Sequence, residues 1–291
     1  MRRHHRAARE YRVRILLVTS FHEHLSALAG FHLNWRAAFS GRMLTLAHLS
    51  ASTRAEMLAE MAAEGVFPSA EGLIVNPLSI ATRYGTALPM MIHNHLTAAR
   101  MGIEASHICL ASPYLYAFQP GLDDAVEQFD CGLPSATFPV HDGWFWSDIV
   151  KRDARLAALA RHLGAPLQVG RADGVFLTRG LFDAMLALLQ RFISLEEIAV
   201  LDPVYPIEEI LFPTMLPALL GTQGRIGTTR ARVWEPGDPL TQAAVSAAIG
   251  SGLYASGKRI PQVASDPIRR AVLDNLPGRL VLNTCLGRID A

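Results

Sequence analysis

Short hydrophobic runs alternate with longer amphipathic segments along the chain. Four runs have the length and the Val, Ile and Leu content of buried strands: VRILLVTS (13–20), RMLTLAHL (42–49), GLIVNP (72–77) and SHICLAS (106–112). Between them, apolar residues recur at helical spacing in three segments: 24–39, 53–65 and 88–102. Strands that alternate with helices are typical of a parallel sheet covered by helices, so the pattern predicts an α/β fold.

The pattern is less regular further along the chain. We expect a helix from about 120 to 129, a break over 131–143 that contains Gly and Pro, and one helical segment over 147–164. The stretch 166–182 predicts a strand, a glycine turn and a second strand running into a helix. Residues 221–239 predict a loop around one short strand.

Composition narrows the classes of partner. With 27 basic against 26 acidic residues the formal net charge is +1, which removes the electrostatic argument for a nucleic-acid-binding protein. The arginine-rich start offers a peripheral contact to anionic lipid or to a partner, and a solvated, frayed terminus is the alternative. Because no linker or repeat is visible, we expect a basic extension over 1–12 and a single domain over 13–291.

Cysteines and hydropathy indicate the compartment. Cys109, Cys131 and Cys285 have no close spacing, so the sequence predicts neither a disulfide framework nor a zinc cluster. No segment approaches the about 20 apolar residues of a membrane span. These observations favour a reducing, cytoplasmic setting.

The standard nucleotide and hydrolase fingerprints are absent. The chain has no G-x-G-x-x-G after the first strand, no G-x-x-x-x-G-K-[ST], no G-x-S-x-G and no H-E-x-x-H. It also has no D-x-D, the closely placed carboxylates that a metal holding a nucleotide diphosphate needs. His93 and His95 stand two apart in a helical segment and point in different directions, which argues against a shared metal. We therefore expect no metal and no cofactor.

Two adjacent glutamates are the sequence's best candidates for chemistry. Glu208 and Glu209 are the only charges in VYPIEEILFPTMLPALL (204–220). Such carboxylates either reach water at the end of an element or are desolvated, which raises the pKa and suits a general base. Pro206 suits the first helical turn and would place both glutamates near the positive end of a helix. Two solvated glutamates that only serve the helix dipole are the alternative.

Basic residues near the end of the domain could replace a metal. Lys258 and Arg259 stand in the glycine-containing segment ASGKRIP, and Arg269 and Arg270 follow in SDPIRRAVL. Arginine and lysine neutralise phosphates, and a neighbouring glycine lets the backbone approach a ligand. Taken alone, these pairs are more typical of a solvated surface than of a phosphate site.

Two further segments could form the walls of a site. In GRADGVFLTRGLF (170–182), Asp173 and Gly174 could form a turn that offers backbone donors and a carboxylate, or an ordinary hairpin turn. Trp144 belongs to GWFWSD (143–148), an aromatic cluster that could stack on a sugar or belong to the core.

Six segments, taken in chain order, match one pattern. They are VTSFHEHLSAL (18–28), TLAHLS (45–50), NPLSIATRYGTALPMMIHNHLTAA (76–99), HICLASPYLY (107–116), GVFLTRGLF (174–182) and EEILFPT (208–214). Tyr84-Gly85 takes the place of a W-G turn, and GVFLTRGLF is similar to G-S-x-[WF]-F-x-[LV]-[ST]-R. EEILFPT is similar to D-E-x-x-[WF]-x-T, with Glu209 on the glutamate and Thr214 on the threonine. Over roughly residues 13–275 the chain resembles the core-2/I-branching β-N-acetylglucosaminyltransferases and their bacterial relatives.

The resemblance implies a fold and a reaction. It implies a GT-A-like three-layer α/β/α sandwich with a mixed, mostly parallel sheet, and inverting, metal-independent transfer from a UDP-sugar to a glycan or small-molecule acceptor. The transferred sugar would be GlcNAc or xylose-like. In that family the glutamate matched by Glu209 is the catalytic base. Basic residues near the C-terminus hold the diphosphate, which points to Lys258 and Arg259, with Arg269 as a helper.

The resemblance also divides the remaining candidates between donor and acceptor. The residues expected on the nucleotide side are Thr19, His22, His48 and Arg83. The residues expected on the acceptor side are Asp173, Gly174, Trp144 and Glu208.

Departures from the family pattern keep a second class of function open. The second strand ends in His48-Leu49-Ser50, where the family usually carries an aspartate, and the turn Pro113-Tyr114 lacks the common acidic residue. A catalytically inactive nucleotide- or carbohydrate-binding module is therefore the alternative. A glycoside hydrolase fits less well, because adjacent glutamates on a helix diverge and cannot flank one bond.

Overall fold

The computed structural model describes most of the chain. The described residues are 11–22, 25–40, 43–51, 54–63, 72–80, 87–200, 205–235, 237–263 and 265–276. Three of the sequence candidates, the basic start up to residue 10, Arg83 and Cys285, lie outside them. The first strand begins at Tyr11, two residues inside the extension expected over 1–12. Among the described helices, none is long and apolar enough to cross a membrane.

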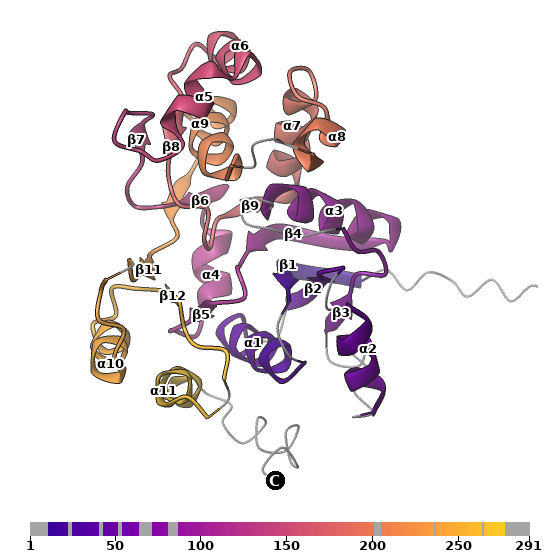
Figure 1. Ribbon diagram of the computed structural model, residues 1–291, viewed down its shortest axis with the longest axis vertical. Coiled ribbons are helices and arrows are strands. Elements are labelled where there is room, and N and C mark those ends of the chain that lie inside the picture. The colour runs from indigo at the N-terminus through magenta and orange to yellow at the C-terminus, as the bar shows by residue number, and fades with distance from the viewer. Residues whose placement is uncertain are drawn as a thin grey trace, which may run out of the picture.

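A seven-stranded mixed sheet forms the centre of the molecule (Figure 1). Its strands, in spatial order, are β10 (Ile226–Thr228), β6 (Cys131–Leu133), β9 (Phe176–Thr178), β4 (Ile103–Leu110), β1 (Tyr11–Phe21), β2 (Met43–Leu49) and β3 (Leu73–Val75). Every neighbouring pair is parallel except the two that β9 makes with β4 and β6. The α/β class with a mixed, mostly parallel sheet is therefore confirmed.

Helices cover both faces of this sheet (Figure 1). The helices that share the buried cluster on one side are α3 (Ala87–Arg100), α5 (Ser147–Arg152), α6 (Ala154–Leu163), α7 (Arg179–Leu189), α8 (Leu195–Ala199) and α9 (Glu208–Leu220), with α6 contacting α9. The helices that share the cluster on the other side are α1 (Leu25–Ala38), α2 (Arg54–Ala63), α4 (Leu122–Glu127), α10 (Gln242–Gly250) and α11 (Pro267–Asn275), with α10 contacting α11. The arrangement is the expected three-layer sandwich.

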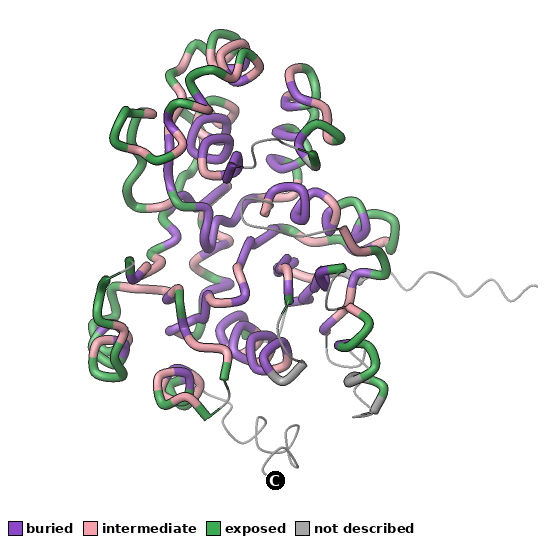
Figure 2. Tube along the Cα trace, in the orientation of Figure 1, coloured by how far each residue is buried: buried purple, intermediate pink, exposed green. Residues whose placement is uncertain are grey.

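The alternation of side chains along β1 shows how the sequence builds the two cores. Ile15 and Leu17 point into one cluster of buried residues, and Leu16 and Val18 point into the other. Successive strand residues face opposite sides of a sheet, so an unbroken apolar run buries both faces at once. Figure 2 shows the buried trace concentrated in these central strands and in the helix faces against them.

Two small sheets extend the domain. One consists of β11 (Ala231–Val233), β12 (Ser256–Lys258) and β5 (Leu115–Ala117), and the other of β7 (Phe138–Pro139) and β8 (Gln168–Val169). Residues 171–173, which follow β8, and Lys258 at the end of β12 lie near the carboxyl ends of β1 and β4, since all of them line one hollow with Ser20 and Leu110.

Three expectations need correction. The segment 147–164 forms two helices, because Asp153 adopts an extended conformation and its carboxylate caps α6 through the Arg155 N–H. The segment 221–239 contains two strands, β10 and β11, where we expected one. Residues 166–182 do not form a hairpin, since β8 pairs with β7 while β9 pairs with β4 and β6.

Candidate functional site

A polar cleft opens where the central parallel strands end. Val18 of β1 is level with Leu110 of β4, and the residues that follow these positions line a cleft of about 570 Å³. Ligands of open α/β sheets bind at this carboxyl edge, because the loops that leave neighbouring strands separate there. We call this hollow the transfer cleft. Its lining residues are Ser20, Ala87, Met90, Leu110, Ala111, Ser112, Tyr114, Arg171, Ala172, Asp173, Pro206, Glu208, Glu209, Lys258, Arg259 and Pro261.

The first turn of α9 brings both candidate glutamates to the cleft. The helix begins at Glu208, with no side-chain cap, and carries Pro213 inside it. A proline has no N–H, so the Glu209 carbonyl lacks its usual helical donor. The Gly170 N–H donates to that carbonyl at 2.8 Å. Because Pro213 leaves this carbonyl without a helical donor, the carbonyl can bond to Gly170, and this bond connects the start of α9 to the segment that carries Asp173.

Thr214 makes a second tie between these segments. Its hydroxyl accepts a hydrogen bond from the Gln168 N–H at 2.9 Å and is itself buried. Together the two contacts hold β8 and the following turn against α9. The threonine of the EEILFPT segment therefore has a structural task in this chain.

Glu208 is a buried carboxyl on the wall of the cleft. Its residue is only 5% exposed, and burial raises its pKa to about 8, while a hydrogen bond from the Leu88 backbone N–H opposes the rise. Its Oε2 atom has no hydrogen-bond partner among the described residues. At neutral pH such a carboxyl is mostly protonated and can donate a hydrogen bond to a ligand.

Glu209, next in sequence, is in a different environment. It is partly exposed, and burial raises its pKa while the nearby Arg171 opposes the rise. Successive helical residues differ by about 100° in direction, which explains why adjacent glutamates receive different exposure. Glu209 combines access to the cleft with a raised pKa, as a general base requires.

Three cations face these carboxylates. The Lys258 ammonium donates to Asp173 Oδ2 at 2.6 Å, and Arg171 donates to Glu235 at 2.5 Å. Arg259 is exposed and has a φ of 75°, in the left-handed region that non-glycine residues seldom adopt. Such an outlier is retained where the surrounding structure requires the side chain to point in one direction.

The structure brings together five of the residues predicted from sequence. They are Glu208, Glu209, Asp173, Lys258 and Arg259, and all of them line the transfer cleft. His22 lies beside them, exposed after β1, with its ring centroid 6.2 Å from that of Tyr114.

Arg269 does not reach the cleft. It is 2% exposed, donates from Nη1 to the Gln262 carbonyl and lies with its guanidinium 5.9 Å from the Tyr116 ring centroid. Gly30 makes room for it, because a Cβ there would overlap the guanidinium. Its contacts are those of a core residue that joins α11 to α1, which does not fit the role of a diphosphate-binding helper.

Two of the predicted nucleotide-side residues are fully buried. Thr19 is within β1, and His48 near the end of β2 accepts the Ile80 N–H on Nε2 at 2.8 Å. Burial lowers the pKa of His48 to about 4, and the neighbouring His93 adds to this. His48 is therefore neutral at physiological pH, and neither residue lines the cleft.

The other two acceptor-side candidates also lie elsewhere. Trp144 is partly buried and packs against the core, the alternative that the sequence left open. Gly174 turns away from the cleft and lines a separate cavity. The Asp173-Gly174 turn thus contributes one residue to each of two hollows.

Sequence reasoning missed several lining residues. Ser20 lies near the end of β1, and Ser112 and Tyr114 follow the end of β4, so the rule that ligands bind at the carboxyl edge of a sheet could have identified them. Arg171 stands two residues before Asp173, yet its approach to Glu209 depends on the contact between Gly170 and α9. The described residues contain no group of three or more His, Cys, Asp or Glu side chains placed to hold a metal ion.

Comparisons with known proteins give distant structural matches only. No protein-family model matches the chain, and neither does any curated protein sequence. Similar solved structures include a nucleoside-diphosphate-sugar pyrophosphorylase from Vibrio cholerae, with 11% identity, a TM-score of 0.39, and coverage of 74% of this chain and 90% of that one.

Two glycosyltransferases are also similar in structure. One is the galactosyltransferase LgtC in complex with donor and acceptor sugar analogues, with 10% identity, a TM-score of 0.39, and coverage of 90% of this chain and 83% of that one. The other is apo-form glycosyltransferase GlyE of Streptococcus pneumoniae, with 10% identity, a TM-score of 0.41, and coverage of 90% and 60%.

Proposed function

We propose that this chain is a GT-A-like glycosyltransferase that moves a sugar, GlcNAc or xylose-like, from a UDP-sugar to a hydroxyl of a glycan or small-molecule acceptor. The transfer would invert the anomeric carbon and need no metal. One observation carries the proposal. A single cleft at the carboxyl edge of the sheet holds a partly exposed glutamate with a raised pKa, a buried glutamate, and cations from two other segments.

Glu209 would be the base. Its carboxylate takes the proton of the acceptor hydroxyl as that oxygen attacks the anomeric carbon, and the bond from this carbon to the UDP oxygen breaks. The electron pair of that bond leaves with UDP. The partly exposed position of Glu209 in the cleft supports this role, because a base must reach the hydroxyl within hydrogen-bond distance.

Arg259 and Lys258 would meet the charge that develops on the diphosphate. Arg259 is exposed at the cleft, and its guanidinium can form paired hydrogen bonds to phosphate oxygens. Lys258 uses one donor on Asp173, and an ammonium group has two more for a phosphate. Asp173 would then hold the lysine in place, in addition to lining the acceptor side.

Glu208 would bind the acceptor as a neutral group. With a pKa of about 8 it is mostly protonated at pH 7 and can donate a hydrogen bond that a carboxylate cannot. Two carboxyls whose environments separate their pKa values can serve as base and as donor in one site.

A panel of UDP-sugars tests the function. The purified chain is incubated with each donor, with and without EDTA, and the UDP released is measured; slow hydrolysis suffices where the acceptor is unknown. We expect one donor to be turned over with EDTA present, and NMR of the product to show the inverted anomer. Binding of UDP without turnover of any UDP-sugar would instead establish the inactive binding module.

A further inference from the structure

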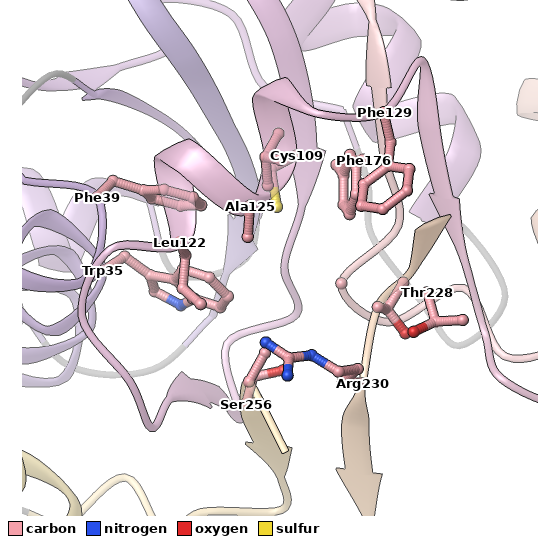
Figure 3. Close-up of a pocket in the computed structure, with 14 residues that line it drawn as sticks. Trp35, Phe39, Cys109, Leu122, Ala125, Phe129, Phe176, Thr228, Arg230 and Ser256 are labelled. Atoms are coloured by element: carbon pink, nitrogen blue, oxygen red, sulfur yellow. The ribbon is translucent and has the colours of Figure 1, made fainter. Parts of the chain in front are cut away.

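A second cavity lies on the opposite side of the Asp173-Gly174 turn. Its volume is about 260 Å³, and it is bordered by α1, α4, the central sheet and the small sheet that contains β12, with an opening to solvent (Figure 3). We call it the apolar cavity. No described residue lines both this cavity and the transfer cleft. It takes no part in the transfer proposed above.

Four aromatic side chains line this cavity. Trp35 of α1 and Phe39, which follows this helix, stack with ring centroids 5.5 Å apart, and Phe129 and Phe176 line the other side (Figure 3). The Trp35 N–H donates to the Leu115 carbonyl at 2.9 Å, so the indole is satisfied and presents an apolar surface. A wall of this kind favours a flat or apolar ligand.

The wall is shaped by two glycines. A Cβ on Gly132 would overlap the Phe176 ring, and a Cβ on Gly227 would lie 2.6 Å from the Phe129 ring. Both rings therefore occupy their positions only because neighbouring strands carry glycine. Burial raises the pKa of the Cys109 thiol to about 12, so this lining residue also stays uncharged.

One charged side chain lines this apolar wall. Arg230 is exposed, and Figure 3 shows its guanidinium extended over the cavity toward Ser256. Its φ of 47° places a non-glycine residue in the left-handed region, between β10 and β11. Within the described part of the chain, no carboxylate forms an ion pair with this guanidinium.

From these observations we propose that the apolar cavity binds a small amphipathic anion, with a ring or short apolar body against the aromatic wall and one carboxylate or comparable anionic group on Arg230. The size agrees. An apolar cavity of about 150 Å³ can hold benzene, so about 260 Å³ suits a fused bicyclic ring. The guanidinium supplies charge complementarity beside the polar lining residues Thr228, Thr229 and Ser256.

Three naphthalene probes of nearly equal shape test the charge requirement. They are naphthalene-1-acetate, naphthalene-1-ethanol and 2-(1-naphthyl)ethylamine, titrated calorimetrically into wild type, Arg230→Gln and Ala125→Leu. Arg191→Gln, at an exposed arginine outside both cavities, is the matched control. Ala125 lines the cavity on α4, and leucine there fills the space while retaining helix propensity.

We expect one equivalent of naphthalene-1-acetate to bind wild type and Arg191→Gln about tenfold more tightly than the alcohol, with the amine weaker still. Arg230→Gln should remove the preference for the acid and retain binding of the alcohol. Ala125→Leu should abolish binding of both, with an unchanged circular dichroism spectrum. Saturating UDP should not displace the probe.

Other results would overturn the inference. Equal affinity of wild type for the acid and the alcohol would show that Arg230 does not bind the anionic group. Undiminished binding to folded Ala125→Leu would place the probe elsewhere, and no binding of any probe would show that the cavity is not a ligand site. Each of these outcomes is independent of whether the transfer cleft turns over a UDP-sugar.

Discussion

The transfer cleft and the apolar cavity lie on either side of the same two segments. Asp173 lines the first and Gly174 the second; on β12, Ser256 lines the cavity and Lys258 the cleft. The cleft gathers three carboxylates and three cations, whereas the cavity has one cation over an aromatic wall. Two strand and turn segments thus separate a charged environment from an apolar one.

The difference shows where this fold can keep charges. The cleft lies at the carboxyl edge of the sheet, where loops diverge, ion pairs form and water enters. The cavity lies beneath α1 and α4, where unpaired charge would be costly, and its one arginine is exposed. Polar chemistry and apolar binding can therefore be perturbed separately, and the following predictions use that separation.

The largest effect should come from Glu209→Gln. The change keeps the shape of the side chain and removes the base, so transfer should fall by about 10²–10⁴-fold with UDP affinity nearly unchanged. In wild type the rate should rise with pH as Glu209, whose pKa burial raises, becomes ionised. Initial rates against pH measure both effects. Glu196→Gln, at an exposed position, is the control. Equal transfer rates for the two variants would show that Glu209 is not the catalytic base.

Lys258→Ala with Arg259→Ala should have the next largest effect. Because these cations meet the diphosphate, affinity for UDP should fall by about 100-fold and affinity for uridine by little. Calorimetric titration of both ligands measures the difference, with Arg191→Gln as control. A similar loss for both ligands would show that the pair acts through folding, since uridine lacks the phosphates.

Glu208→Gln should change how stability depends on pH. Its folded pKa of about 8 lies above the ordinary 4.5, so the folded state retains a proton that the unfolded state releases. Its contribution is full below about pH 4.5 and is lost as pH rises to about 8. Glutamine should remove this loss, so the gain in the free energy of unfolding of the variant over wild type should be larger at pH 9 than at pH 5 by about 4 kcal/mol.

Urea unfolding at the two pH values tests the prediction for Glu208. The buried histidines titrate in both proteins, so their contribution cancels when the free energy of unfolding of wild type is subtracted from that of the variant. The remaining pH dependence is that of the Glu208 carboxyl. Glu196→Gln should show no such difference. A pH-independent difference for Glu208→Gln would mean that the carboxyl titrates at its ordinary pKa.

Gly174→Ala should have a small effect on the wall between the two hollows. Its φ of 74° is unfavourable for alanine, while the nearest atom to an added Cβ would be 3.5 Å away, so backbone strain costs about 1 kcal/mol and crowding little. Thermal unfolding measures the loss. Gly180→Ala in α7 is the matched control, with an open Cβ position and a gain from helix propensity. Equal shifts in both variants would exclude the backbone argument.

The sequence predicted the elements whose environment is local. The apolar run of β1 serves two cores at once, and the glutamates stand in the first turn of α9 as expected, although Pro206 lies two residues before the helix and not in its first turn. The adjacent glutamates diverge on the helix, as expected from the rotation between successive helical residues, and Glu208 is buried while Glu209 is partly exposed. Such features follow from spacing along one element, so periodicity is sufficient to find them.

Features that depend on distant segments could not be predicted from spacing. Arg259 and Arg269 both stand in basic pairs, yet one lines the cleft and the other is buried, because Gly30 on α1 leaves space beneath α11. The residues that line the apolar cavity come from α1, α4, β4, β9 and the small sheet. No pattern within one segment predicts that these elements lie close together. Only the packed structure identifies it.

Hydrogen–deuterium exchange with saturating UDP tests the central claim, that the transfer cleft holds the donor, most directly. The account predicts slower exchange in residues 111–114, 171–173 and 258–263, and no change in α4 or in 228–230. Naphthalene-1-acetate should give the reverse pattern. Protection by UDP at α4 and 228–230, with none at the cleft, would contradict the assignment of the donor to the transfer cleft.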